Sequence, residues 1–126
     1  GFNVINEVEF ELDIKADRDQ LFRAISNLIM NARQVGASLV RVTAEENETS
    51  IIIEISDDGP GMSENARKKL FQPFSGSSRQ GGTGLGLVIV RDILRAHGGD
   101  VALVSAAEEN TTFRLAIAKL ADDPKP

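Results

Sequence analysis

The chain has 126 residues, which is enough for one domain around a single hydrophobic core. It contains no cysteine, and this excludes disulfides, thiolate metal sites and a cysteine nucleophile. The formal net charge is −5 and there is no tryptophan or tyrosine to stack on bases, so we expect no nucleic acid as a partner. No apolar run reaches the roughly 18 residues of a membrane span, and we expect a cytoplasmic domain.

The first two elements predicted along the chain are a strand and a helix. Apolar residues alternate with acidic ones over Val8–Ile14, which is the period of a strand with one solvated face. Asp17 fits the N-cap of a helix that runs to about Val35, where Gly36 ends it. Eight apolar side chains of this helix form one stripe that we expect to face the core: Leu21, Phe22, Ala24, Ile25, Leu28, Ile29, Ala32 and Val35.

Two asparagines, Asn27 and Asn31, lie one helical turn apart at the border of this stripe. Asparagine is a mediocre helix former, so the pair needs a reason. The simplest reason is a polar surface. The alternative is that both side chains line a cleft at the edge of the core, where an amide oxygen can bind a hard cation.

A hairpin of two strands is predicted between residues 38 and 56, and it leads into Asp57. Asp57 shares its parity with three isoleucines, so its carboxylate is predicted to point to the buried face, where an unpaired charge is costly. An acceptor-only group at the bottom of a pocket suits the exocyclic amine of adenine and repels the carbonyl of guanine. Gly59 and Gly61 allow the backbone to approach a ligand, and Asp58 is interpreted as a solvated neighbour.

Residues 71–86 are interpreted as a mobile lid that binds phosphate. Three glycines at alternate positions, Gly82, Gly84 and Gly86, allow successive N–H groups to turn toward phosphate oxygens. The helix that begins at about Leu85 adds the positive end of its dipole at the same place. The spacing is neither the G-x-G-x-x-G of a dinucleotide fold nor the Gly-Lys-Ser/Thr of a P-loop. Because the chain is negatively charged overall, a phosphate ligand here predicts a divalent counter-cation.

The rest of the chain is predicted to complete one α/β domain of residues 1–126. A short helix capped by Ser63 precedes the lid, and the helix after the lid ends at the glycine pair 98–99. His97, in the last turn of that helix, suits the helix dipole rather than acid–base chemistry. Two strands joined by a polar turn follow, and residues 121–126 are expected to form a tail.

Four motifs occur in a fixed order along the chain: Asn27/Asn31, Asp57-x-Gly-x-Gly61, Phe71-x-Pro-Phe74 and Gly82-x-Gly-x-Gly86. In this combination the chain resembles the ATP-binding catalytic domain of bacterial sensor histidine kinases. The same superfamily includes gyrase, the Hsp90 chaperones and MutL-type repair ATPases. The resemblance implies a two-layer α/β sandwich, in which about three helices cover one face of a mixed sheet and a flexible lid covers ATP.

The resemblance also implies roles for individual residues. Asn31 matches the amide that binds Mg²⁺ between the phosphates, and Asn27 lies where these kinases place a second polar contact near the metal. Asp57 matches the acceptor of the adenine amine, in a pocket shaped by two glycines, Gly59 and Gly61. The residues that match the phosphate-binding end of the lid are Gly82, Thr83, Gly84, Leu85 and Gly86, with Arg79 as a basic lid residue that reaches the terminal phosphates.

One position distinguishes the kinases from their hydrolysing relatives, which carry a glutamate four residues before the metal-binding amide. This chain has Asn27 there, and an amide cannot take a proton from water at neutral pH. No side chain is therefore given a catalytic role beyond positioning by Asn27 and Arg79. The γ-phosphoryl group should wait for an external nucleophile, with positioning and Mg²⁺ supplying most of the rate.

The resemblance implies that this nucleophile is a histidine on a dimerisation domain outside this chain, with a response regulator as an indirect partner. We expect the isolated domain to be a monomer and its parent protein a homodimer. His97 lacks the acidic residue that usually follows a phospho-acceptor histidine, so the chain is expected to phosphorylate nothing by itself. Gln34 and Val35 stand where many of these kinases have a lysine and an aromatic residue, so one phosphate contact and one adenine-ring contact are expected to be absent.

Two other functions stay open at this point. An anti-sigma-type serine kinase uses the same fold at similar length without a histidine-bearing module. A pseudokinase would bind nucleotide or a partner protein without transferring phosphate. An acceptor-histidine segment elsewhere in the parent protein would exclude the first, and phosphoryl transfer to a supplied dimerisation domain would exclude the second.

Overall fold

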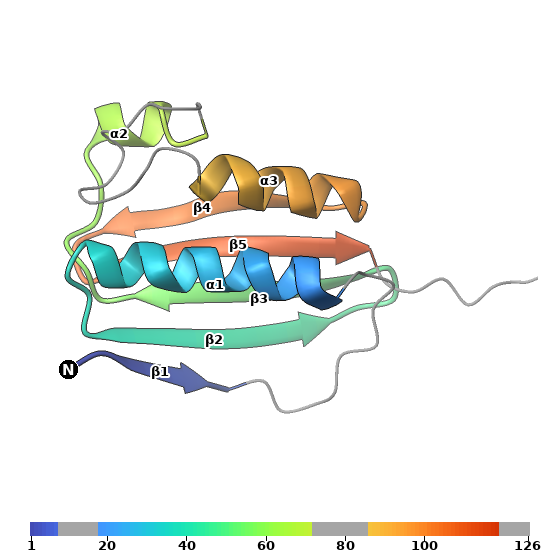
Figure 1. The fold of residues 1–126 in the computed structure, drawn as a ribbon, viewed down its shortest axis with the longest axis horizontal. Helices are drawn as coiled ribbons and strands as arrows, with labels where there is room; N and C mark the ends of the chain where they lie inside the picture. Colours follow the sequence, from blue (N-terminus) through green and yellow to red (C-terminus); the bar gives the residue numbers. More distant parts are fainter. Residues whose placement is uncertain (8–17, 72–85, 119–126) are drawn as a thin grey trace, which may run out of the picture.

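The computed structural model describes residues 1–7, 18–71 and 86–118. Within these ranges five strands form one sheet in the order β1-β2-β3-β5-β4, and three helices accompany it (Figure 1). The elements in chain order are β1 (Asn3–Asn6), α1 (Arg18–Gln34), β2 (Leu39–Glu46), β3 (Ser50–Asp57), α2 (Glu64–Lys68), α3 (Gly86–Ala96), β4 (Asp100–Ala107) and β5 (Asn110–Ala118).

The sheet is mixed, because β1 is parallel to β2 whereas the other neighbouring strands are antiparallel. The two longer helices, α1 and α3, lie side by side on one face of the sheet, and the short α2 lies at one end of this helical layer (Figure 1). This arrangement confirms the predicted two-layer α/β sandwich.

The core lies between the sheet and the two longer helices. Along β3 every second side chain is buried, and the central member, Ile53, is 2% exposed. On β5 the same alternation buries Phe113, Leu115 and Ile117. The helices fill the other side with small and branched side chains, which are Ala24, Leu28 and Ala32 of α1 and Leu87, Val90, Ile93 and Leu94 of α3.

The stripe predicted on α1 is confirmed for its central members but is wrong for Phe22, which is 73% exposed. Residues four apart stack on one face of a helix, and the buried face of α1 is the one that carries Ala24, Leu28 and Ala32. Met30, further along the helix, is also exposed. Both side chains therefore point away from the core.

The first strand is an element that the sequence analysis did not predict. The strand expected over Val8–Ile14 lies outside the described residues, and β1 is found before it. All four residues of β1 are exposed, so no buried period marks it in the sequence. Backbone pairing holds it in place, beginning with the N–H of Asn3, which donates to the carbonyl oxygen of Ser38 at 2.9 Å.

Glycines end both long helices, as predicted. Gly36 has φ +97°, and its N–H donates to the carbonyl oxygen of Arg33 at 3.1 Å. The next N–H, that of Ala37, donates to the carbonyl oxygen of Ala32 at 3.1 Å, which completes a Schellman motif. Helix α3 ends in the same motif at Gly98, where φ is +76°.

Asp58, directly after β3, ties the loop between α1 and β2 to the end of β3. Its Oδ1 accepts the N–H of Ser38 at 2.8 Å and the N–H of Leu39 at 3.0 Å, and its own N–H donates to the carbonyl oxygen of Leu39 at 3.2 Å. The predicted solvent exposure of Asp58 is confirmed, but the sequence analysis missed these hydrogen bonds. The hydrogen bonds from Leu39 and Ser38 hold the pKa of the Asp58 carboxyl below its ordinary value.

Two glycine substitutions should separate backbone strain from steric overlap. A Cβ on Gly36 meets nothing within 4 Å, so Gly36→Ala should cost only the left-handed conformation, about 1 kcal/mol. A Cβ on Gly99 would overlap the carbonyl oxygen of Ala116 on β5, so Gly99→Ala should cost about 3 kcal/mol or more. Urea denaturation of both variants measures the two costs, and equal destabilisation would contradict the packing described for Gly99.

Replacing Asp58 by asparagine should weaken the acid dependence of stability. Because the pKa of Asp58 is lower in the folded chain than in the unfolded one, its ionised form contributes stability above the ordinary carboxyl pKa of about 4. That contribution is lost as the pH falls through the folded pKa, and asparagine has no such contribution to lose. Between pH 7 and about pH 3 the unfolding free energy should fall further for the wild type than for Asp58→Asn.

Urea denaturation at the two pH values measures this difference. Glu48→Gln, on the exposed turn between β2 and β3, is the matched control for the loss of one surface carboxylate. If Asp58→Asn and the wild type lost the same free energy in acid, the hydrogen bonds to Asp58 would not be linked to its ionisation.

Candidate functional site

The elements that carry the predicted site residues meet at one end of the sheet. Figure 1 shows the C-terminal ends of α1 and β3 at this end, together with the turn between β4 and β5 and the N-terminal end of α3. Helix α2 lies above the same end (Figure 1). The sites predicted separately on α1 and on β3 are thus brought to a common region.

Asp57 is the last residue of β3, and its side chain points to the helix-covered face. It is 6% exposed, which confirms the inward direction predicted from its parity with Ile51, Ile53 and Ile55. Its Oδ1 accepts the N–H of Gly59 at 2.8 Å, and this bond fixes the orientation of the carboxylate. The strand therefore delivers a carboxylate acceptor to the edge of the core.

Thr111 is a candidate site residue that the sequence analysis missed. It lies directly opposite Asp57 in the pairing of β3 with β5, and it is completely buried. Its Oγ1 has no hydrogen-bond partner among the described residues, and a buried hydroxyl in this state costs about 1–3 kcal/mol. The signal was present in the sequence, because Thr111 shares the parity of the buried Phe113 and Leu115.

Asn31 lies on α1 at the border of the core, as predicted, beside the fully buried Ala32. Its Nδ2 is buried and has no hydrogen-bond partner in the part of the chain that the structure describes. Asn27, one turn earlier, is half-buried on the same helix. An amide that is short of a polar partner fits a bound ligand, and its oxygen is a ligand type that hard cations such as Mg²⁺ accept.

The loop that contains Gly59 and Gly61 packs closely against the hairpin of β4 and β5. Gly59 is buried, and its carbonyl oxygen accepts the N–H of Glu109 at 2.8 Å. Gly61 has φ +81°, and a Cβ there would lie 2.5 Å from the carbonyl oxygen of Ala106, which also accepts the N–H of Met62 at 3.1 Å. The structure thus gives Gly61 a packing role, and its role in a ligand pocket stays a prediction.

Most of the predicted phosphate-binding residues lie outside the described residues. They are Arg79, Gly82, Thr83, Gly84 and Leu85. The predicted anchors Pro73 and Phe74 are also outside them. Gly86 is described, and it is the first residue of α3. The start of α3 therefore lies at the end of the sheet where the other site elements meet (Figure 1).

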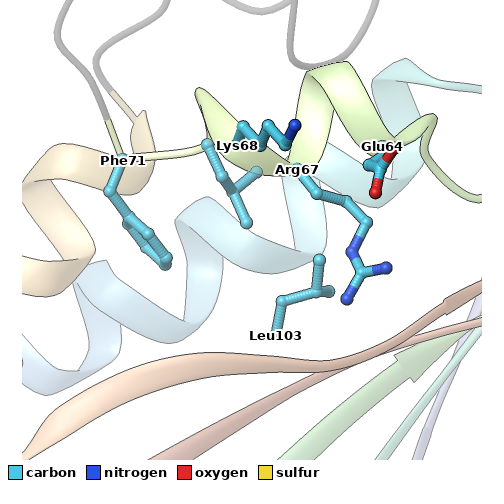
Figure 2. Close-up of a pocket in the computed structure, with 6 residues that line it drawn as sticks. Glu64, Arg67, Lys68, Phe71 and Leu103 are labelled. Atoms are coloured by element: carbon cyan, nitrogen blue, oxygen red, sulfur yellow. The ribbon is translucent and has the colours of Figure 1, made fainter.

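A separate hollow of about 350 Å³ lies between α2 and β4 (Figure 2). Figure 2 shows Phe71 and Arg67 pointing toward the strand that carries Leu103. Phe71 packs against the core, as predicted for the near end of the lid, and the guanidinium carbon of Arg91 lies 4.9 Å from its ring centroid. The hollow is lined by Glu64, Arg67, Lys68, Leu70, Phe71 and Leu103 and is distinct from the amide and carboxylate groups described above.

The described residues limit the chemistry of the site. No group of three or more His, Cys, Asp or Glu side chains in these ranges could hold a metal ion by itself.

None of the helices in the described ranges is long and apolar enough to cross a membrane. Among these residues the site offers a buried carboxylate, a buried hydroxyl and an amide, which can form hydrogen bonds to a polar ligand.

Comparison with known proteins gives a family for this arrangement. Residues 16–121 match the family described as histidine kinase-, DNA gyrase B- and HSP90-like ATPases. The sensor histidine kinase ZraS of Escherichia coli is 34% identical over 105 residues, which cover 82% of this chain and 22% of ZraS. The chain therefore spans less than a quarter of the length of this curated relative.

Solved structures agree with the sequence match. The nucleotide-free catalytic domain of histidine kinase ThkA has a TM-score of 0.75 at 28% identity, with 98% of this chain and 82% of that chain covered. Full-length ShkA in complex with AMPPNP has a TM-score of 0.81 at 28% identity, with 96% of this chain and 26% of that chain covered. The chain belongs to the family of histidine kinase-, DNA gyrase B- and HSP90-like ATPases, and it is an ATP-binding catalytic domain of the sensor histidine kinase type.

Proposed function

We propose that this chain, as a single domain, binds Mg-ATP and presents its γ-phosphoryl group to a histidine on a separate dimerisation domain of the parent protein. The observation that carries the proposal is the buried Asp57 carboxylate at one end of the sheet. At the same end, the amide nitrogen of Asn31 has no partner among the described residues. A response regulator would then receive the phosphoryl group from that histidine. An ATP-dependent reaction of this kind belongs in the cytoplasm.

Adenine is the base that the described groups fit best. The Asp57 carboxylate can accept the exocyclic N–H of adenine, whereas guanine would bring a carbonyl oxygen against it. The Thr111 hydroxyl, opposite Asp57 and without a partner among the described residues, can donate to a ring nitrogen or hold a water beside the base. Two adjacent side chains would therefore read one edge of the base.

The phosphate end of the nucleotide is assigned to α1, to the start of α3 and to the segment between Phe71 and α3. Asn31 would bind Mg²⁺ through its amide oxygen, with Asn27 as a second polar contact. The N–H groups at the start of α3, from Gly86 onward, suit phosphate oxygens. The remaining phosphate contacts are proposed for Arg79, Gly82, Thr83, Gly84 and Leu85. The magnesium ion would neutralise charge on the phosphates when bound.

Phosphoryl transfer by this site rests on positioning. Asn27 occupies the place where a water-activating glutamate would be needed for hydrolysis, and its amide cannot act as a base. The chain's own residues would hold the base, orient the phosphates and leave the γ-phosphoryl group for the acceptor histidine. In this proposal the isolated domain is a monomer, and the parent protein is a homodimer through its dimerisation domain.

Nucleotide binding should depend on the base and on the metal. We expect ADP to bind the wild-type chain in the presence of Mg²⁺ with roughly −6 to −8 kcal/mol, and GDP to bind much more weakly. Asp57→Asn should weaken ADP binding about tenfold or more, because it removes a charged acceptor, and Thr111→Val should weaken it less. Asn31→Ala should remove most of the benefit of Mg²⁺.

Isothermal titration calorimetry with ADP and GDP, with and without Mg²⁺, measures these differences. Asp92→Asn, on the exposed side of α3, is the matched control for the removal of one carboxylate and should bind like the wild type. Equal affinity of the wild type for ADP and GDP would refute the role given to Asp57.

Hydrolysis of ATP by the isolated chain should be slow, on the order of 10⁻³ s⁻¹ or below. Introducing a base in Asn27→Glu should speed phosphate release at least about tenfold relative to Asn27→Gln, which has similar size but only an amide. A phosphate-release assay on the three proteins measures the rates. Rapid hydrolysis by the wild type would contradict the proposal that the γ-phosphoryl group waits for an external nucleophile.

A further inference from the structure

We propose that Asp58 is a positioning residue that sets the spacing between the metal-binding and the base-binding ends of the nucleotide site. This inference rests on the proposed function, in which Asn31 binds the magnesium ion and Asp57 accepts a hydrogen bond from adenine. Asp58 itself touches neither ligand in this proposal. It acts through the loop that joins α1 to β2.

The pairing of β2 with β3 does not reach this loop. The last pair of the ladder is Val40 with Asp57, and Leu39, the one residue of β2 before Val40, has no partner residue on β3 in that register. Asp58 extends the contact beyond the ladder, because its carboxylate accepts the N–H groups of Ser38 and Leu39 at 2.8 and 3.0 Å. The N–H of Asp58 adds a third bond, to the carbonyl oxygen of Leu39 at 3.2 Å.

The same loop is bonded to the end of α1. The N–H of Ala37, next to Ser38, donates to the carbonyl oxygen of Ala32 at 3.1 Å, and Ala32 directly follows Asn31. A short series of hydrogen bonds therefore runs from the residue after Asp57, through the loop, to the residue after Asn31. Removing the Asp58 carboxylate would break its two bonds to Ser38 and Leu39. The N–H of Asp58 would still donate to Leu39, and the N–H of Asn3 to Ser38, so the loop and the last turn of α1 would be loosened rather than released.

The position of Asp58 limits the effect of its removal on folding. The side chain is exposed, so its loss leaves the N–H groups of Ser38 and Leu39 accessible to water rather than buried without partners. The orientation of Asp57 does not depend on it either, because the N–H of Gly59 holds the Asp57 carboxylate at 2.8 Å. Removal of the Asp58 carboxylate should thus disturb the metal end of the site more than the base end.

The test measures ADP and GDP binding by calorimetry, with and without Mg²⁺, for the wild type, Asp58→Ala and Asp58→Asn. In Asp58→Ala the ratio of the ADP dissociation constants without and with Mg²⁺ should fall about three- to tenfold, whereas the preference for ADP over GDP should be kept. Asp58→Asn should restore the wild-type ratio, since its amide oxygen has two lone pairs and can accept both N–H groups. If Asp58 had a merely structural role, Asp58→Ala would lower both the effect of Mg²⁺ on ADP binding and the preference for ADP over GDP.

Asp100→Ala is the matched control. Asp100 is also a surface carboxylate that accepts a backbone N–H, that of Val101 at 2.8 Å, but it begins β4 at the opposite end of the sheet (Figure 1). Both ratios should be unchanged in this variant. Thermal denaturation of each protein checks that binding is measured well below its unfolding transition.

A second readout uses the wild type alone, so it holds even if Asp58→Ala does not fold. Hydrogen exchange of the Ser38 and Leu39 amides should slow when Mg-ADP binds, because the bound nucleotide fixes both ends of the hydrogen-bond series. Unchanged exchange on binding would overturn the inference.

Two outcomes of the calorimetry would also overturn it: an undiminished effect of Mg²⁺ in Asp58→Ala, or no recovery in Asp58→Asn. Failure of the proposed function has a different signature. In that case the wild type would show no Mg²⁺-dependent binding, or Asn31→Ala and Asp57→Asn would leave binding unchanged.

Discussion

The site depends on one constraint, the two-residue period of β3. Because Ile51, Ile53 and Ile55 must face the helices to form the core, Asp57 is carried to the same face. The pairing of β3 with β5 then places Thr111 opposite it. A slip of one residue would turn both the isoleucines and the carboxylate to the solvated face, so the packing that stabilises the domain also orients its polar group.

Local patterns predicted much of this molecule. Parity was sufficient for the inward direction of Asp57, and the 3.6-residue period placed Asn31 at the border of the core. The glycine signals at Gly36 and Gly98 predicted where both long helices end, because each takes up a left-handed conformation that other residues adopt at a cost. These features are encoded within a few residues of the chain.

Features that depend on distant parts of the chain were missed or wrong. The bonds of Asp58 reach a loop about twenty residues earlier, so no local pattern contains them. Thr111 acquires its importance only from the strand pairing that sets it against Asp57. Phe22 fits a broad apolar stripe on a helical wheel, and only the direction from which the sheet covers α1 decides that it is exposed. The predicted phosphate-binding residues from Arg79 to Leu85 lie outside the described residues and stay predictions.

The first strand has a consequence for shortened versions of this domain. The family match starts at residue 16, yet β1 precedes it and pairs with β2 from Leu39 to Val42. A polypeptide cut at the start of the match would leave a row of N–H and C=O groups on β2 without their partners. Exposed rows of this kind recruit strands from other molecules. The family match thus marks a shorter segment than the one that forms the five-stranded sheet, and the shorter segment would be prone to self-association.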